Sequence, residues 1–163
     1  DLAFDLLQTD DEDDEPDRVH RVDEQQQESA DARGIALQTE IEPGLMLQGD
    51  ETMLMRMLIN LMENGIKYGR ENGWLRVTLK QQGAFIRGSV QDNGPGIAPE
   101  HLDQVWKRFW QADPARGKSG AGLGLSMVKW IAEAHGGAVN VRSRQGEGAE
   151  FIFTLPCQAA PQE

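Results

Sequence analysis

The chain has 163 residues, of which 39% are hydrophobic, and its formal net charge at pH 7 is −11. A chain of this length fits one domain with a modest core. The acidic balance argues against a general affinity for nucleic acid or anionic lipid, because both require a basic surface. Any anionic ligand therefore needs a local group of positive charges.

Cysteine usage and hydropathy exclude two further classes of protein. The single cysteine, Cys157, has no partner for a disulfide framework or a cysteine metal cluster, which suits a reducing compartment. No stretch reaches the roughly 18 to 20 apolar residues of a membrane-spanning helix, and the acidic start is unlike a signal peptide. We expect a soluble protein without redox chemistry.

The first part of the chain is acidic and lacks a core-forming pattern. Asp1–Leu7 is typical of the end of an apolar helix, and the acidic run from Asp10 to Asp17 contains Pro16. Because like charges repel, we interpret this run as a solvated linker in preference to a metal site. We expect residues 1–17 to be a helix remnant and linker, residues 18–156 to form the folded domain, and residues 157–163 to be a disordered tail.

Helix and strand signals then alternate along the chain. Residues 23–33 are polar and compatible with a helix that ends at Gly34, and residues 35–41 alternate in the period of a strand. A second helix is expected from Glu51 to Tyr68, with Asp50 as its N-cap. Its apolar stripe consists of Leu54, Leu58, Leu61 and Met62.

The rest of the chain predicts a sheet covered by helices. Residues 75–79 and 86–90 alternate on either side of the turn at Gln82-Gly83, which predicts an antiparallel hairpin. A third helix is expected over residues 123–135, before strands at 138–142 and 150–155. Alternation on one face of most strands predicts an α/β (α+β) two-layer sandwich, with a mixed, mainly antiparallel sheet packed on a helical layer.

The first segment that indicates chemistry lies in the second helix. Asn60, Asn64 and Lys67 are spaced so that they project from one helical face, away from the apolar stripe. Amide oxygens beside an ammonium suit a hydrated Mg²⁺–phosphate group, since this hard ion prefers oxygen ligands and keeps several waters. Alone, the pattern is more typical of a polar helix face in solvent.

The second segment, Asp92–Ile97, follows a predicted strand directly. Its Asn-Gly and Pro-Gly pairs are ordinary turn residues. Asp92 adds chemistry, because a partly buried carboxylate can accept a hydrogen bond from the exocyclic amine of adenine. Gly94 and Gly96 would let a flat base approach the backbone.

The third segment places Gly120, Gly122 and Gly124 before the third helix. Free N–H groups and the helix dipole make such a terminus a phosphate site, and glycine allows close approach. The segment resembles a dinucleotide-binding fingerprint only superficially. A preceding parallel strand and an acidic residue about 20 positions later would be needed, and we reject that interpretation.

An aromatic segment and a short polar loop precede these glycines. We assign Trp106, Phe109 and Trp110 to packing before ligand stacking. Residues 112–119 have the composition of a lid, in which Arg116 and Lys118 would screen phosphates when the loop closes. The same two cations could equally be ordinary surface charges.

In this order and spacing, the segments resemble the boxes of histidine-kinase catalytic domains, within the superfamily of gyrase, chaperone, kinase and MutL ATPases. The resemblance covers residues 35–156 and implies a Bergerat-type fold with ATP held between the helical layer and a mobile lid. Residues 60–68 are similar to the N box, 92–96 to the first glycine box, 106–110 to the F box, 120–124 to the second glycine box and 146–156 to the closing strand segment.

The resemblance also implies a role for individual residues. Asn64 would ligate Mg²⁺, Asn60 would support the water shell of the ion, and Lys67 would contact phosphate. Tyr68 would lie against the nucleotide, and Asp92 would bind the adenine amine. The catalytic set would be Asn60, Asn64 and Lys67, and the ATP site as a whole would comprise Asn60, Asn64, Lys67, Tyr68, Asp92, Gly94, Gly96, Ile97, Arg116, Lys118, Gly120, Gly122, Leu123 and Gly124.

The implied reaction is transfer of the γ-phosphoryl group of Mg-ATP to a histidine on a separate dimerisation domain of the same protein. A response-regulator aspartate would then receive it. Gyrase-type ATPases would call for a glutamate general base at position 60, and the amide of Asn60 cannot act as one. This difference favours transfer over hydrolysis.

Some features depart from the pattern of the family. No histidine has the neighbours of the acceptor motif, and we expect His135 to cap the C-terminal end of a helix. The first helix is shorter than usual, and Ala149 stands where a threonine is common. His20 and His101 likewise have unsuitable neighbours.

Alternative functions stay open at this point. They are an ATP-hydrolysing conformational machine, a nonenzymatic nucleotide sensor and, more weakly, a serine kinase that acts on an anti-sigma partner. In each case ATP is the ligand, and no nucleic acid or direct membrane contact is expected. We expect a monomeric domain in the cytoplasm, and a parent protein in the bacterial cytoplasmic membrane.

Overall fold

The computed structural model describes residues 27–45, 47, 49–108, 110 and 124–157. The expected helix remnant, acidic linker and lid lie outside the described residues, as does the tail beyond Cys157. The elements in chain order are β1 (Ala36–Ile41), α2 (Glu51–Tyr68), β2 (Trp74–Gln82), β3 (Phe85–Asp92), a short 3₁₀ helix (Pro99–His101), α3 (Gly124–Ala134), β4 (Ala138–Arg144) and β5 (Gly148–Pro156).

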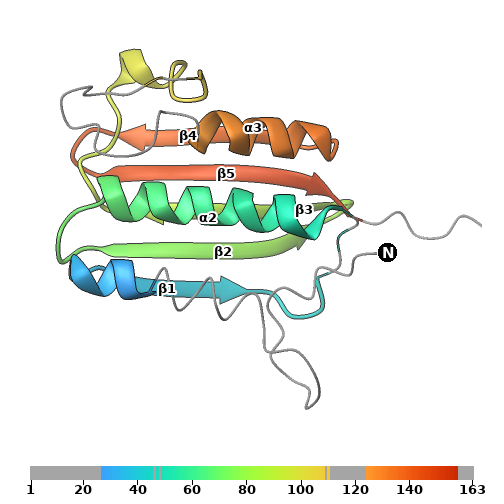
Figure 1. The fold of residues 1–163 in the computed structure, drawn as a ribbon, viewed down its shortest axis with the longest axis horizontal. Coiled ribbons are helices and arrows are strands. Elements are labelled where there is room, and N and C mark those ends of the chain that lie inside the picture. Colours follow the sequence, from blue (N-terminus) through green and yellow to red (C-terminus); the bar gives the residue numbers. More distant parts are fainter. Residues whose placement is uncertain (1–26, 46, 48, 109, 111–123, 158–163) are drawn as a thin grey trace, which may run out of the picture.

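The strands form a single five-stranded sheet in the order β1-β2-β3-β5-β4. β1 pairs with β2 in parallel, and every other neighbouring pair is antiparallel. α2 and α3 lie on the same face of this sheet (Figure 1). The described residues therefore confirm the predicted two-layer sandwich with a mixed, mainly antiparallel sheet.

Local sequence signals set the bounds of α2. Asp50 caps the helix as expected, because its Oδ1 accepts a hydrogen bond from Met53 N–H at 3.1 Å. The helix ends at Tyr68, before Gly69. Asn72 follows with a φ of +61°, a left-handed conformation that asparagine tolerates better than most residues.

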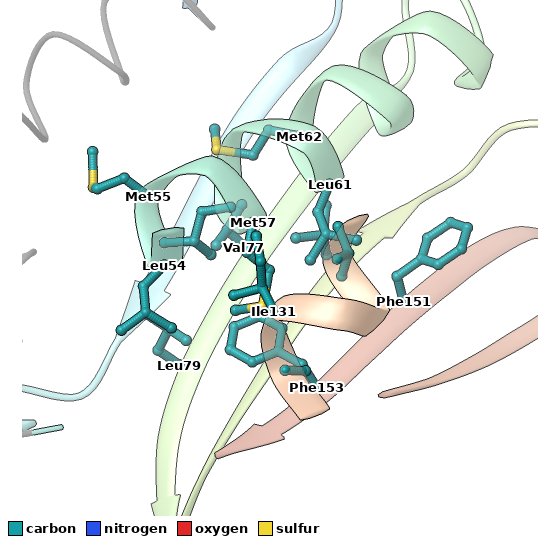
Figure 2. Packing of buried hydrophobic residues seen from close by; sticks show 14 of the residues in the cluster. Leu54, Met55, Met57, Leu61, Met62, Val77, Leu79, Ile131, Phe151 and Phe153 are labelled. Carbon is teal, nitrogen blue, oxygen red and sulfur yellow. The ribbon is translucent and has the colours of Figure 1, made fainter. Parts of the chain in front are cut away.

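The core lies between the two helices and the sheet. Leu54, Met57 and Leu61 of α2 are almost fully buried, and they face β2 and β5 in the cluster shown in Figure 2. The burial of these apolar side chains supplies the main stabilisation of the fold. β3 contributes little bulk at its centre, because Gly88 pairs with Phe153 and leaves room for that ring.

His135 joins the C-terminal end of α3 to the N-terminal end of α2. His135 Nδ1 lies 2.8 Å from the carbonyl oxygen of Ile131, as expected of a residue that caps α3. Its Nε2 also accepts a hydrogen bond from Asp50 N–H at 3.1 Å, which the sequence did not predict. Both bonds together require the neutral tautomer with the proton on Nδ1.

β4 and β5 extend further toward each other than expected. The sequence predicted strands over 138–142 and 150–155, whereas the structure continues β4 to Arg144 and begins β5 at Gly148. Gly146 adopts a φ of +83° in the tight turn between them. None of the helices in the described part of the chain is long and apolar enough to cross a membrane.

Candidate nucleotide-binding site

The polar face of α2 begins the site. Asn60 and Asn64 are half-buried and Lys67 is exposed, whereas Leu61 and Met62 face the core. Asn60 Nδ2 donates a long hydrogen bond of 3.4 Å to the carbonyl oxygen of Gly124, the first residue of α3. The structure therefore brings the first and third predicted segments together.

The end of α2 lies against the second predicted segment. Gly94 is buried, and a Cβ atom there would lie 2.8 Å from the carbonyl oxygen of Tyr68 and 3.0 Å from Gly69 Cα. Only glycine fits this close approach. Lys67 Nζ lies 5.1 Å from the ring centroid of Tyr68, a cation–π geometry on a tyrosine that is 48% exposed.

Asp92 is one of the few buried polar side chains in the described residues, with an exposure of 6%. Its Oδ1 accepts a hydrogen bond from Gly94 N–H at 2.8 Å, and the backbone of Ala149 provides a second bond. Burial raises the pKa of Asp92 above the ordinary value, and the two hydrogen bonds only partly oppose this effect. A buried carboxylate of this kind gains from a further donor such as an amine.

The turn between β4 and β5 holds the loop that follows Asp92. Gly146 N–H donates to the carbonyl oxygen of Pro95 at 2.7 Å, and Ile97 N–H donates to Ser143 Oγ at 2.6 Å. Gly96 has a φ of +77°, and a Cβ there would meet the carbonyl oxygen of Arg144. Gly94, Gly96 and Ile97 are therefore positioned as one loop beside Asp92.

Arg33 is a residue of the site region that the sequence did not reveal. Its guanidinium donates hydrogen bonds to the carbonyl oxygens of Ile66, Lys67 and Gly69, with distances of 2.7 Å for Lys67 and 3.1 Å for Gly69. The free carbonyls at the C-terminal end of α2 thereby gain donors and a positive charge.

The aromatic segment has the packing role that was expected where it is described. The Trp106 ring meets the Phe151 ring edge-on, with centroids 5.7 Å apart, and Trp110 meets His101 at 5.5 Å. Both tryptophans pack partly buried against the core. Phe109 of the aromatic segment lies outside the described part of the chain. So do five predicted site residues, which are Arg116, Lys118, Gly120, Gly122 and Leu123.

The donor set fits Mg²⁺ that is bound mainly through phosphate and water. Among the described residues, no three or more histidine, cysteine, aspartate or glutamate side chains group in a way that could hold a metal ion. The amides of Asn60 and Asn64 lie on one face of α2, and the bond from Asn60 Nδ2 leaves its Oδ1 as an acceptor. Such hard oxygens suit an ion that keeps several waters.

These features together define a class of protein. A mixed sheet with two helices on one face carries a polar helix, a buried aspartate at a strand end and a glycine-rich loop beside it. This combination is the ATP-binding domain of Bergerat type that the resemblance implied.

Comparison with known proteins makes the assignment specific. Residues 49–159 match the family described as histidine kinase-, DNA gyrase B-, and HSP90-like ATPase. The chain belongs to this family. Within it, the similar proteins include a sensor-like histidine kinase and a sensor protein, and the similar structures include a histidine-kinase catalytic domain.

Two curated relatives illustrate the similarity. The sensor-like histidine kinase SenX3 of Mycobacterium tuberculosis is 38% identical over 130 residues, which cover 78% of this chain and 32% of the relative. The sensor protein SrrB of Staphylococcus aureus is 40% identical over 109 residues, covering 66% of this chain and 19% of SrrB. The chain thus spans a third or less of the length of these two relatives.

Solved structures agree with the sequence relatives. Full-length ShkA in complex with AMPPNP has a TM-score of 0.75 and 34% identity, over 88% of this chain and 30% of ShkA. The catalytic domain of the histidine kinase ThkA has a TM-score of 0.74 and 30% identity, over 84% of this chain and 88% of that domain. The chain is therefore an ATP-binding catalytic domain of the kind that sensor histidine kinases contain.

Proposed function

We propose that the domain, residues 18–156, binds Mg-ATP and transfers the γ-phosphoryl group to a histidine on a separate dimerisation domain of the same protein. A response-regulator aspartate then receives the group. The observation that supports this proposal is the hydrogen bond from Asn60 of α2 to Gly124 of α3, which joins the polar face of α2 to the start of α3. The family resemblance implies that a hydrolase would carry a glutamate base at position 60, where this chain has an amide.

The side chain at position 60 supports transfer over hydrolysis. A water-activating general base must accept a proton, and an amide has no such capacity at neutral pH. Asn60 is also held by its bond to Gly124 O. Glu63, the nearest carboxylate along the helix, is exposed. An in-line transfer to a histidine needs no base at this position, because the imidazole itself is the nucleophile.

The residues of this chain bind and orient the nucleotide. Asp92 accepts a hydrogen bond from the adenine amine, and Gly94 and Gly96 allow the base to lie against the loop. Lys67 contacts phosphate. Asn64 would ligate Mg²⁺, and Asn60 would support the water shell of the ion. The ion, when bound, neutralises charge on the phosphates, and phosphoryl transfer depends chiefly on such neutralisation and on positioning.

The proposal also includes the partners of the domain and its location in the cell. The parent protein supplies the dimerisation domain, and a response regulator accepts the phosphoryl group. SenX3 and SrrB are named as sensor proteins, and the likeness supports a parent in the bacterial cytoplasmic membrane with this domain in the cytoplasm, where ATP is available.

The test is a calorimetric titration of ATP into the chain, with and without Mg²⁺, while ADP release is monitored. We expect binding with almost no turnover, loss of binding in Asp92→Asn, and loss of the Mg²⁺ dependence in Asn64→Ala. An exposed aspartate provides the matched control, because Asp103→Asn should bind ATP as the wild type does.

A second step tests the transfer itself. The parent dimerisation domain is added with γ-labelled ATP, and label is expected on its histidine with the wild type but not with Asn64→Ala. Absence of ATP binding by the wild type would refute the proposal. Rapid ADP release without the partner would indicate a hydrolase, and binding without transfer would indicate a nucleotide sensor.

A further inference from the structure

β4 carries a hydroxyl at a position where its alternation calls for an apolar side chain. Val139, Val141 and Ser143 share the less exposed face of the strand, and they pair with Phe153, Phe151 and Ala149 of β5. The two valines pack against the core. Ser143, next in the same row, lies instead beside the loop that follows Asp92.

Ser143 uses its hydroxyl in both directions. Oγ accepts a hydrogen bond from Ile97 N–H at 2.6 Å and donates one to the carbonyl oxygen of Gly148 at 3.0 Å. A hydroxyl has one proton to donate and can accept through its lone pairs, so the two bonds are compatible. Ser143 therefore joins the loop after Asp92 to the first residue of β5.

Both hydrogen-bond partners of this hydroxyl belong to segments that adjoin Asp92. Gly148 has a φ of +105°, and a Cβ there would meet the backbone of Asp92, so β5 begins against that residue. The next residue, Ala149, bonds the Asp92 carboxylate through its backbone. Ile97 ends the loop that starts at Asp92. The hydroxyl thus fixes the far end of the loop relative to the carboxylate.

We propose that Ser143 is a positioning residue that sets the selectivity of the site for adenine over guanine nucleotides, an inference that rests on the proposed function. Adenine offers an amine donor where guanine has a carbonyl oxygen, which a carboxylate repels. This discrimination requires that the base be held against Asp92. A loop released from Ser143 lets either base shift away from the carboxylate.

The experiment compares Mg-ATP and Mg-GTP affinities of the wild type, Ser143→Ala and Ser143→Thr at a temperature where all are folded. For Ser143→Ala we expect ATP affinity to fall about five- to tenfold, as one lost hydrogen bond with an unsatisfied partner implies. GTP affinity should change less than about twofold, so that the ATP/GTP ratio falls. Ser143→Thr keeps the hydroxyl and should therefore have the ATP/GTP ratio of the wild type.

The ratio distinguishes positioning from a merely structural role. General loosening of the domain lowers both affinities in proportion, and that result would overturn the inference, as would an unchanged ratio in Ser143→Ala. The exposed Ser29 provides the control, because Ser29→Ala should bind both nucleotides as the wild type does. If Ser143→Ala is unfolded, Ser143→Cys takes its place, since a thiol of similar size bonds poorly.

The outcomes also separate this inference from the proposed function. A wild type that binds no ATP overturns both. A wild type that prefers ATP, with a ratio that Ser143→Ala and Ser143→Cys leave intact, overturns the positioning role alone.

Discussion

Asp92 is a buried carboxylate at the end of β3, and its burial has an energetic cost. The charged form loses hydration, and the backbone N–H groups of Gly94 and Ala149 compensate only in part, so that the pKa is raised. Side chains with such perturbed pKa values gather at functional sites. A nucleotide amine would supply the further donor that the carboxylate lacks in the free domain.

The pKa of Asp92 gives a prediction with a definite sign. The carboxylate of the free domain should titrate above 3.8, the ordinary value for aspartate. ATP should lower this pKa, because the adenine amine bonds the ionised form more strongly than the protonated form. By linkage, ATP affinity should fall as the pH falls through the raised pKa, and binding in that window should release a proton.

The measurement is a ¹³C NMR titration of the side-chain carboxyl groups, with and without saturating ATP. The signal that disappears in Asp92→Asn identifies the residue. A titration of this signal at or below the ordinary value in the free domain would contradict the prediction, and so would an upward shift on addition of ATP.

At the scale of elements, the C-terminal end of α2 depends on a residue outside the helix. Arg33 follows the helical residues 27–32 and reaches three carbonyl groups at the end of α2. The same turn of α2 carries Lys67 and Tyr68, and Gly94 packs against it. Arg33 therefore supports the surface on which the phosphate and base contacts of the proposed site are built.

Arg33→Gln should lower the free energy of unfolding by about 1–3 kcal/mol, the range for charged hydrogen bonds whose acceptors are left partly unsatisfied. Urea denaturation gives this value. Arg56 is the control, because it is exposed on the middle of the same helix, and Arg56→Gln should change the free energy by less than about 0.5 kcal/mol. Equal effects of the two changes would show that Arg33 does not stabilise the helix end.

The elements themselves could be predicted from sequence because their signals are local. Asp50, the apolar stripe of α2 and the Gln82-Gly83 turn each act within a few residues, and the structure confirms the helix and hairpin that they predicted. Arg33 and Ser143 could not be identified in this way. The partners of Arg33 lie 33 to 36 residues away in the sequence, and Ile97, the partner that links Ser143 to the site loop, lies 46 residues away, so that only the fold brings them together.

The only local sign of either residue was weak. Ser143 replaces an apolar residue in the row of Val139 and Val141. Only the pairing of β4 with β5 shows that Ser143 belongs to this row. Asn93 is a similar case. Its side chain accepts a hydrogen bond from Trp74 N–H at 2.8 Å, so the residue ties β2 to the site loop in addition to forming a turn.

For the molecule as a whole, the proposed site lies where separate elements meet. It includes the end of α2, the end of β3 and the start of α3, and the β4–β5 turn holds its loop. α2 and α3 are joined by polar links at Asn60–Gly124 and Asp50–His135, both made through single hydrogen bonds. A ligand that contacts all these elements adds interactions that only the folded state offers.

Mg-ATP should therefore stabilise the entire domain against heat. At a free concentration of 100 times its Kd, a ligand that binds only the folded state adds about 2.7 kcal/mol. In a chain of this size that free energy corresponds to an increase in Tm of about 5–10 °C. Differential scanning calorimetry with and without Mg-ATP measures the increase.

Asp92→Asn decides where this stabilisation arises. If the nucleotide binds through Asp92, the variant should unfold at the same temperature with and without Mg-ATP at the concentration that shifts the wild type. An equal shift in both proteins would mean that the triphosphate is held by cations elsewhere on the surface. Because the net charge is −11, such nonspecific binding should also disappear when salt screens the local charges, whereas a shift that depends on the buried carboxylate should persist.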